Sequence, residues 1–284
     1  MTYRAFRPNS TRRAKLERAR TRSADVPLPR LLLWLTSLAA LAWCALSWPE
    51  LPSASTLGIA FIGLLMYATL GVLWPQSGMY GTALARGKPG QSRVALTFDD
   101  GPHPVTTRAV LALLRHYDVR ATFFVLGHKV EAHPDVVREI HEAGHSLGIH
   151  GFQHARLFSL HSSGYARAQI ERTQQAIARA CGVTATLFRP PIGFASHRTF
   201  RGAELAAVEV IAWSVRSLDG LASAEPGRVA ERVIAHLKDG AIVLMHDAAE
   251  RDDFTPASIA ALPKILQALR ERRLSAVSVD QLAR

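Results

Sequence analysis

Charged and polar residues recur where apolar, strand-like segments of this chain end, and this pattern limits the fold more than any other feature. Asp99 and Asp100 close the apolar run 94–98, and His246 closes the run 242–245. Segments of helical periodicity separate such runs, and this alternation is typical of parallel strands joined by crossover helices. We therefore expect an α/β domain, barrel-like or doubly wound, whose functional side chains collect at the carboxyl ends of its strands.

The coarse apolar pattern places these elements along the chain. The predicted strands are 93–98, 121–126, 146–149, 186–189, 208–215, 241–246 and 275–279. The predicted helices are 105–117, 133–143, 163–180, 199–206, 226–238 and 256–272.

The adjacent carboxylates Asp99 and Asp100 are followed at once by Gly101 and Pro102. Neighbouring side chains of a strand point to opposite faces, but at a strand end that breaks into a turn both can point into one cleft. Asp and Gly are also common turn residues, so this cluster alone is equally compatible with a structural turn.

Further clusters of the same character make a functional site the better interpretation. His150 and His154 are spaced at i and i+4, which lets two imidazoles in a helical turn share a face and chelate a metal. Arg189 ends a short apolar run before two prolines that fix the following loop. Asp219 ends another strand-like segment.

In this order the clusters resemble the motifs of the polysaccharide deacetylases of carbohydrate esterase family four, whose domain is also called the NodB homology domain. The matching segments are Thr97-Phe98-Asp99-Asp100-Gly101-Pro102, His150-x-x-x-His154, Arg189-x-Pro191, Trp213-Ser214-Val215 with Asp219, and Leu244-x-His246. The resemblance covers most of the chain and implies a distorted (β/α) barrel. It also implies metal-dependent hydrolysis of an N-acetyl or O-acetyl group on a sugar, by a hydrolase of carbon-nitrogen bonds other than peptide bonds.

The resemblance implies a metal site at Asp100, His150 and His154. One carboxylate and two imidazoles suit Zn²⁺ best, although cobalt, nickel or another divalent ion is chemically compatible. Such an ion would polarise the acyl carbonyl and prepare water for attack. Asp99, next to a ligand, is then expected to be the general base.

The remaining motifs imply the acid and two orienting residues. His246 is expected to protonate the leaving amine, with its pKa held up by Asp219. Arg189 is expected to hold Asp99 through a bidentate pair and to keep it ionised.

Three positions depart from the family pattern. Ile192 stands where an aromatic residue is common, and Arg216 and Gly220 stand where an acid and a Trp are common. The backbone N–H near Ile192, next to Pro191, is still expected to bind the oxyanion. The substrate groove is expected to differ in shape from that of the family pattern. An alternative interpretation is therefore a catalytically weak glycan- or glycolipid-binding protein of the same fold. The joint presence of base, acid, ligands and both orienting partners favours the enzyme.

Two ionisable residues beside the motifs have open roles. Asp247 either tunes His246 or caps the loop, and His103 lies just past the paired carboxylates. The other histidines fall in helical or loop patterns among charged neighbours, and we expect them to be structural or solvated.

Two uncharged apolar segments, about 31–48 and 57–74, precede the catalytic region. Each apolar core has ~18 residues, enough for a short or nearly upright membrane span. Trp48 and Trp74 stand at segment ends, as interfacial anchors do. We therefore expect a two-helix transmembrane hairpin before the barrel.

The 284 residues thus divide into four predicted parts, and their boundaries are 1–30 (basic disordered cytoplasmic tail), 31–80 (hairpin), 81–92 (linker) and 93–284 (catalytic domain). The first thirty residues hold nine Lys or Arg against two acids, so they contribute +7 of the net charge of +11. We expect this tail to bind anionic membrane lipid. A nucleic-acid partner is not expected, because no aromatic-interleaved basic patch follows.

Charge also predicts orientation. The turn between the spans has no Lys or Arg, whereas Arg86, Lys88 and Arg93 follow the second span, so both ends of the hairpin are expected in the cytoplasm. The sequence predicts a multi-pass protein of a bacterial-type cytoplasmic membrane, acting on a lipid-linked or intracellular acylated amino-sugar glycan, a polyprenyl-linked sugar or another small amide.

The opposite orientation stays open. If the first segment is a cleaved signal, or only one segment spans, the domain lies outside on peptidoglycan or an exported polysaccharide; the long tail and the lack of a clear cleavage site disfavour the signal. Cys44 and Cys181 cannot form a disulfide within the domain, so either compartment is compatible with them.

Overall fold

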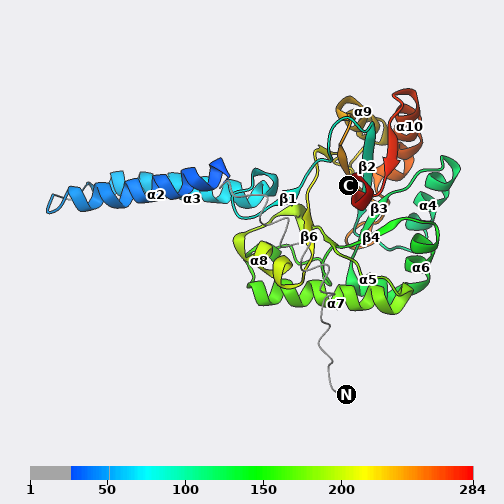
Figure 1. The fold of residues 1–284 in the computed structure, drawn as a ribbon, viewed down its shortest axis with the longest axis horizontal. Coiled ribbons are helices and arrows are strands. Elements are labelled where there is room, and N and C mark those ends of the chain that lie inside the picture. The colour runs from blue at the N-terminus through cyan, green and yellow to red at the C-terminus, as the bar shows by residue number, and fades with distance from the viewer. Residues whose placement is uncertain (1–26, 51, 284) are drawn as a thin grey trace, which may run out of the picture.

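The structure of the protein, a computed structural model, describes residues 27–50 and 52–283 (Figure 1). It has two parts, an N-terminal helical hairpin and an α/β domain. Most of the predicted disordered tail, residues 1–26, lies outside the described residues. The last residues assigned to that tail, Leu28 to Arg30, instead begin the first helix of the hairpin.

The hairpin consists of α2 (Leu28–Leu46) and α3 (Ala54–Leu73), which extend together away from the α/β domain (Figure 1). No residue of α2 is buried, and only Gly71 of α3 is. Both helices are long and apolar enough to cross a membrane. Their exposure shows that they are not core helices of the barrel.

The base of the hairpin packs on the α/β domain. The amide of Ala195 in the domain donates to the carbonyl of Val72 of α3 at 3.1 Å. The guanidinium Nε of Arg30 donates to the carbonyl of Met79 at 2.8 Å, which holds α2 against the segment that leads into β1. After the short helix η1 (Pro75–Ser77) the chain forms β1 (Ala83–Leu84), which joins the sheet inside the stretch predicted as a linker.

The domain is built on one nine-stranded sheet in which all paired strands are parallel. The strands after β1 are β2 (Arg93–Asp99), β3 (Thr122–Val125), β4 (Ser146–Ile149), β5 (Leu187–Phe188), β6 (Glu209–Ile211), β7 (Val215–Arg216), β8 (Ile242–His246) and β9 (Ser275–Val277). Their order is β1-β6-β5-β4-β3-β2-β8-β7, and β9 pairs with β2.

Helices surround this sheet (Figure 1). They are α4 (Thr106–His116), α5 (Gly127–Ala132), α6 (Pro134–Glu142), α7 (Ser163–Cys181), α8 (His197–Leu205), α9 (Pro226–His236), α10 (Ala257–Glu271) and α11 (Val279–Leu282), with the short turns η2 (Phe158–Leu160) and η3 (Pro191–Gly193). Parallel strands with crossover helices confirm the predicted distorted (β/α) barrel.

The predicted strand 208–215 is wrong as a single element. Its residues form β6 and β7, which lie toward opposite ends of the sheet order, and the chain crosses between them at residues 212–214. The buried guanidinium of Arg189 explains the break, because it hydrogen-bonds the carbonyls of Ile211 and Ala212 at 3.4 and 3.1 Å. Those carbonyls are satisfied by a side chain rather than by a neighbouring strand.

The strand register brings the predicted site residues together. Asp99 at the end of β2 pairs with His246 at the end of β8, and Ile149 at the end of β4 pairs with Phe188 of β5. The β2 segment is buried almost throughout, as expected for a central parallel strand covered on both faces. The carboxyl ends of β2, β4, β5 and β8 therefore share one edge of the barrel.

Candidate active site

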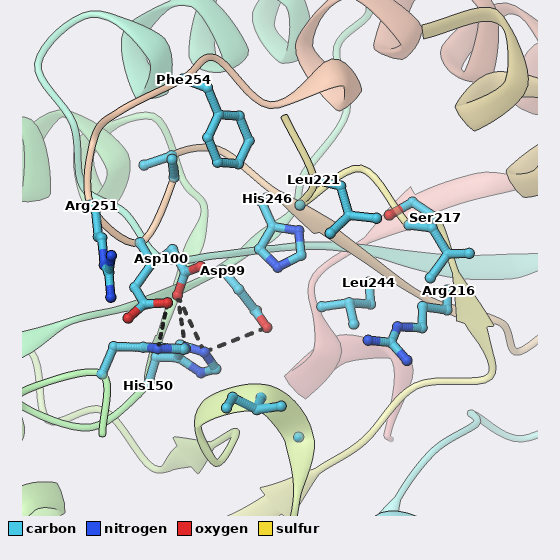
Figure 2. A pocket seen from close by; sticks show the side chains of 18 of the residues that line it. Asp99, Asp100, His150, Arg216, Ser217, Leu221, Leu244, His246, Arg251 and Phe254 are labelled. Atoms are coloured by element: carbon cyan, nitrogen blue, oxygen red, sulfur yellow. Dashed lines mark ion pairs between the residues drawn. The ribbon is translucent and has the colours of Figure 1, made fainter. Parts of the chain in front are cut away.

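Asp99 and Asp100 both point into one cleft at the end of β2, although they are neighbours in the chain. Asp100 adopts a left-handed backbone conformation with φ of +72°, which Asp tolerates better than most residues and which breaks the alternation of the strand. Both carboxylates are buried, and His150 Nε2 lies 3.5 Å from Asp100 Oδ1 and 3.9 Å from Asp99 Oδ2 (Figure 2).

Asp100, His150 and His154 form a cluster with the composition of a metal site. Asp100 Oδ1 is 3.5 Å from Nε2 of each histidine, and one ligand atom from each of the three residues lies within 4.8 Å of the others. These separations exceed ordinary hydrogen bonds, and buried Asp100 Oδ1 has no hydrogen-bond partner among the described residues. A carboxylate and two imidazoles so placed fit a divalent cation.

His150 is prepared to be a neutral ligand. Burial lowers its pKa to about 3, despite the attraction of the Asp100 carboxylate. Its Nδ1 lies 2.8 Å from the carbonyl oxygen of Arg189, and a hydrogen bond donated there leaves the lone pair on Nε2, facing Asp100.

A cavity of about 330 Å³ opens over this cluster. Its walls come from the ends of several strands and from the loop after β8 (Figure 2). Trp213, Arg216, His246 and Phe254 are among the side chains that line it. The cleft is therefore large enough for part of a substrate beside the candidate metal site.

Arg189 holds Asp99 through one hydrogen bond rather than the predicted bidentate pair. Its Nη1 donates to Asp99 Oδ1 at 2.8 Å and to Thr97 Oγ1 at 2.7 Å, while Nη2 is used by the carbonyl of Ala212. The guanidinium is fully buried and lies 4.2 Å from the centre of the Phe124 ring. Burial raises the pKa of Asp99 more than the charge of Arg189 lowers it, so the predicted effect of Arg189 on Asp99 is only partial.

Asp219 and His246 form a close pair. Asp219 Oδ1 accepts from His246 Nδ1 at 2.9 Å, and Oδ2 accepts from the backbone N–H of His246 at 2.7 Å. The hydroxyl of Ser217 also donates to this carboxylate. Burial alone would lower the pKa of His246, but the charge and hydrogen bond of Asp219 raise it to about 10. His246 is therefore protonated near neutral pH.

The η3 turn places Pro191 and Ile192 beside the cleft. Ile192 has a φ of +61°, which is costly for a β-branched residue and marks a strained turn. Gly193 follows with a φ of +81°, and a Cβ there would lie 2.1 Å from an atom of the Trp213 ring. Trp213 therefore packs directly under the turn.

Gly220, one of the departures from the family pattern, lies directly against His246. A Cβ at Gly220 would lie 2.9 Å from Cε1 of His246, so a larger residue requires a different backbone or imidazole position here. Arg216, on β7, lines the cavity without an ion pair in the part of the chain that is described.

His103 and Asp247, whose roles the sequence does not decide, stabilise the scaffold. The ring Nδ1 of His103 accepts the backbone N–H groups of Val105 and Thr106, at the start of α4. Buried Asp247 accepts a hydrogen bond from the hydroxyl of Thr107 on α4, which anchors the loop after β8.

Sequence reasoning missed the contribution of the loop after β8. Glu250, Arg251 and Phe254 line the cavity, although the sequence singles out only the preceding His246 and Asp247. No spacing or motif marks these residues, because their position depends on how the loop folds back over the strand ends.

An α/β barrel with an Asp-His-His cluster, a buried Asp-Arg pair and an Asp-His pair around one cleft defines a class of candidate metal-dependent hydrolases. The polysaccharide deacetylase family profile matches residues 86–211. The chain is 34% identical over 193 residues to a peptidoglycan-N-acetylglucosamine deacetylase of Bacillus cereus, with 67% of this chain and 88% of that protein covered. The chain belongs to the polysaccharide deacetylase family, which confirms the predicted resemblance.

Further relatives extend this comparison. The peptidoglycan-N-acetylglucosamine deacetylase PgdA of Listeria monocytogenes is 37% identical over 190 residues, covering 67% of this chain; the chain spans only 38% of the length of that relative. The structure of the peptidoglycan deacetylase PdaC from Bacillus subtilis has a TM-score of 0.61 at 32% identity and covers 69% of this chain and 91% of that chain. A CE4 family pseudoenzyme from Bacillus anthracis has a TM-score of 0.63 at 27% identity and covers 70% of this chain and 67% of that chain.

Proposed function

We propose that the protein is a metal-dependent hydrolase that removes an N-acetyl group from an amino sugar of a glycan. The observation that carries the proposal is the convergence of three elements on one cleft: Asp100 with its two histidines, Asp99 beside them, and a protonated His246. Relatives named as peptidoglycan-N-acetylglucosamine deacetylases support the same reaction class.

Asp100, His150 and His154 would hold the cation, and the chemistry of this donor set favours Zn²⁺. When bound, a divalent cation supplies Lewis-acid polarisation of the acyl carbonyl. Asp99 lies at the edge of this cluster, 3.9 Å from His150, and its carboxylate takes the proton of the attacking water. Arg189 fixes the orientation of that carboxylate by its hydrogen bond to Oδ1, which leaves Oδ2 facing the cleft.

The proton for the leaving amine comes from His246. Its Nδ1–H is engaged by Asp219, so the Nε2–H of the imidazolium is the proton available to substrate. An amide nitrogen leaves poorly without protonation, and Asp219 keeps the imidazolium charged at neutral pH. A backbone N–H near Ile192, in the η3 turn next to Pro191, stabilises the oxyanion of the tetrahedral intermediate.

The chain division and location are also part of the proposal. We propose a basic tail followed by a membrane hairpin formed by α2 and α3, and a catalytic domain that begins with β1 and lies at the cytoplasmic face of a bacterial-type membrane. Two exposed apolar helices support an anchor, and a signal sequence near the N-terminus is the competing explanation. The substrate is then a lipid-linked or intracellular acylated glycan, while the opposite orientation gives access to peptidoglycan.

Acetate release tests the proposed reaction. The full chain in detergent, loaded with Zn²⁺, is incubated with N-acetylated chitooligosaccharide and with purified peptidoglycan, and both acetate and new amines are quantified. We expect equal amounts of acetate and amine, loss of both after chelation, and recovery on adding Zn²⁺. The matched control Asp118→Asn changes a carboxylate that is 94% exposed and should leave the rate unchanged. Glycan binding without acetate release would instead identify a binding protein that kept the fold.

A further inference from the structure

Glu250 lies behind one of the candidate metal ligands. Its Oε2 is 3.5 Å from Nδ1 of His154, while Nε2 of the same imidazole is 3.5 Å from Asp100 Oδ1. The two ring nitrogens face different directions, so Glu250 meets the side of the ring turned away from Asp100. It is therefore placed to act on the ligand rather than to be one of the ligands.

The Nδ1 atom of His154 needs such a partner. It is buried and has no hydrogen bond among the described residues. A movement of about 0.5 Å would bring it within hydrogen-bond distance of Glu250. His150 shows the equivalent arrangement already formed, with its Nδ1 2.8 Å from the carbonyl of Arg189. The two histidines thus have different supports, a neutral carbonyl for one and a carboxylate for the other.

A buried lysine fixes the loop on both sides of Glu250. Lys129 of α5 is only 4% exposed, and its Nζ donates to the carbonyl of Ala249 at 2.7 Å and to Asp252 Oδ1 at 2.6 Å. The hydrogen bond between Asp247 and Thr107 holds the start of the same loop. An almost fully buried lysine is uncommon unless it is paired, so this arrangement indicates a loop held in a defined position.

The ion pair of Glu250 with Arg156 does not by itself explain the position of Glu250. The Arg156 Nη2 is 3.2 Å from Glu250 Oε2, but the Arg156 side chain is 61% exposed. Ion pairs this open to solvent stabilise a fold little. The same carboxylate oxygen faces both Arg156 and the buried Nδ1 atom of His154.

We propose that Glu250 is a positioning residue for the metal site, accepting the Nδ1–H of His154 so that Nε2 is presented to the cation. Such an outer carboxylate fixes the tautomer and the ring orientation and makes the imidazole a stronger donor. Lys129 supports this role by holding the backbone around Glu250. The inference rests on the proposed metal-dependent function and adds to it a residue outside the family motifs described above.

Metal affinity tests the inference without relying on catalysis. Zn²⁺ binding to the full chain in detergent is measured by competition with a chromophoric chelator, for wild type, Glu250→Ala and Glu250→Gln. Loss of an outer-shell partner weakens metal binding by about 10- to 100-fold, and we expect Glu250→Ala in that range. Glu250→Gln should lose less, because its amide oxygen still accepts a hydrogen bond. The unfolding midpoint of the metal-free protein should be the same for all three.

Two controls separate this role from general charge effects. Asp253→Asn removes an exposed carboxylate from the same loop, and Arg156→Gln breaks the ion pair but keeps Glu250. Both should bind Zn²⁺ as tightly as wild type. Unchanged Zn²⁺ affinity in Glu250→Ala overturns the inference. So does a loss of affinity that is matched by a fall in the unfolding midpoint of the metal-free protein. In both cases the proposed function still stands. A wild-type protein that binds no Zn²⁺ overturns both.

Discussion

Replacing Asp219 by Asn removes the negative charge that keeps His246 protonated, while preserving the size of the side chain. Asp219 is fully buried and accepts two hydrogen bonds from His246, at 2.9 Å from Nδ1 and 2.7 Å from the backbone N–H. His246 carries the positive charge of this pair and faces the cleft. The substitution therefore changes the proton donor without touching the candidate metal ligands.

The size of the effect follows from the lost charge. A hydrogen bond to a charged partner contributes about 1.5–3 kcal/mol, and a tenfold change in proton affinity corresponds to about 1.4 kcal/mol. The pKa of His246, raised to about 10 in the wild type, should therefore fall in Asp219→Asn by about one to two pH units.

The assay is the pH–rate profile of kcat for an N-acetyl substrate. Loss of the proton from His246 defines the alkaline limb, so this limb should move to lower pH by about one to two units in the variant. An activated acetyl ester, whose leaving group needs no proton, should show no comparable shift. Asp253→Asn serves as the control for loss of a carboxylate near the cleft. An alkaline limb that stays in place for the amide substrate would refute the assignment of His246 as the acid held by Asp219.

The same pair makes a pH-dependent contribution to stability. Because the pKa of His246 is raised above its ordinary value of 6.5, its contribution is complete below that pH and is lost as the pH rises through about 10. The pKa of Asp219 is lowered, since His246 and Ser217 outweigh the effect of burial, so its contribution is present above pH 3.8 and lost at lower pH. The stability difference between wild type and Asp219→Asn should accordingly shrink at both ends of this range, as measured by urea unfolding.

Four further substitutions test the site and its scaffold. Asp99→Asn should abolish acetate release while Zn²⁺ stays bound, whereas His150→Ala should lose the metal; equal metal loss in both would show that base and ligand are assigned wrongly. Arg189→Met should lower the free energy of unfolding by about 3–5 kcal/mol in a urea titration, because it leaves Asp99 buried without its partner. Gly193→Ala should lower it by about 1–3 kcal/mol, because the new Cβ meets Trp213 and φ is +81°; a stability equal to wild type would mean that the η3 turn is not held as described.

Hydrophobic periodicity and turn-forming residues predict most of the barrel, because each central strand is a short apolar run bounded by turn residues. The predicted strand 146–149 and the observed β4 coincide, and the helix predicted at 163–180 is one residue shorter than α7. The split of 208–215 could not be predicted, since the carbonyls of Ile211 and Ala212 bond the guanidinium of Arg189, which comes from the loop after β5. A run of apolar residues does not show where its backbone stops pairing with one strand and begins to pair with another.

Short elements were missed for a related reason. Residues 127–132 form α5, but six residues are too few for helical periodicity to be recognised. The two residues of β1 are likewise too few for a strand pattern, and only pairing with β6 defines them. Tertiary contacts, rather than local preference, form these elements.

The sequence predicts those site residues that lie in the ordered motifs at strand ends, and it does not predict the others. The structure brings Asp99, Asp100 and His246 together because their strands end at one edge of the sheet. The alternation of strand and helix patterns in the sequence already predicts this arrangement. Glu250 and Lys129 could not be found this way, since neither stands at a strand end and their contacts cross between α5 and the loop after β8. The single hydrogen bond between Arg189 and Asp99 depends on how the guanidinium is shared, which no sequence pattern encodes.

Anomalous diffraction at the zinc edge from crystals of the Zn²⁺-loaded protein tests the central claim most directly. The account predicts one strong peak with Asp100, His150 and His154 as its protein ligands and with Asp99 beside it but not bound. A peak at other residues, or no peak at this cluster, would contradict a metal-dependent hydrolase built on these three side chains.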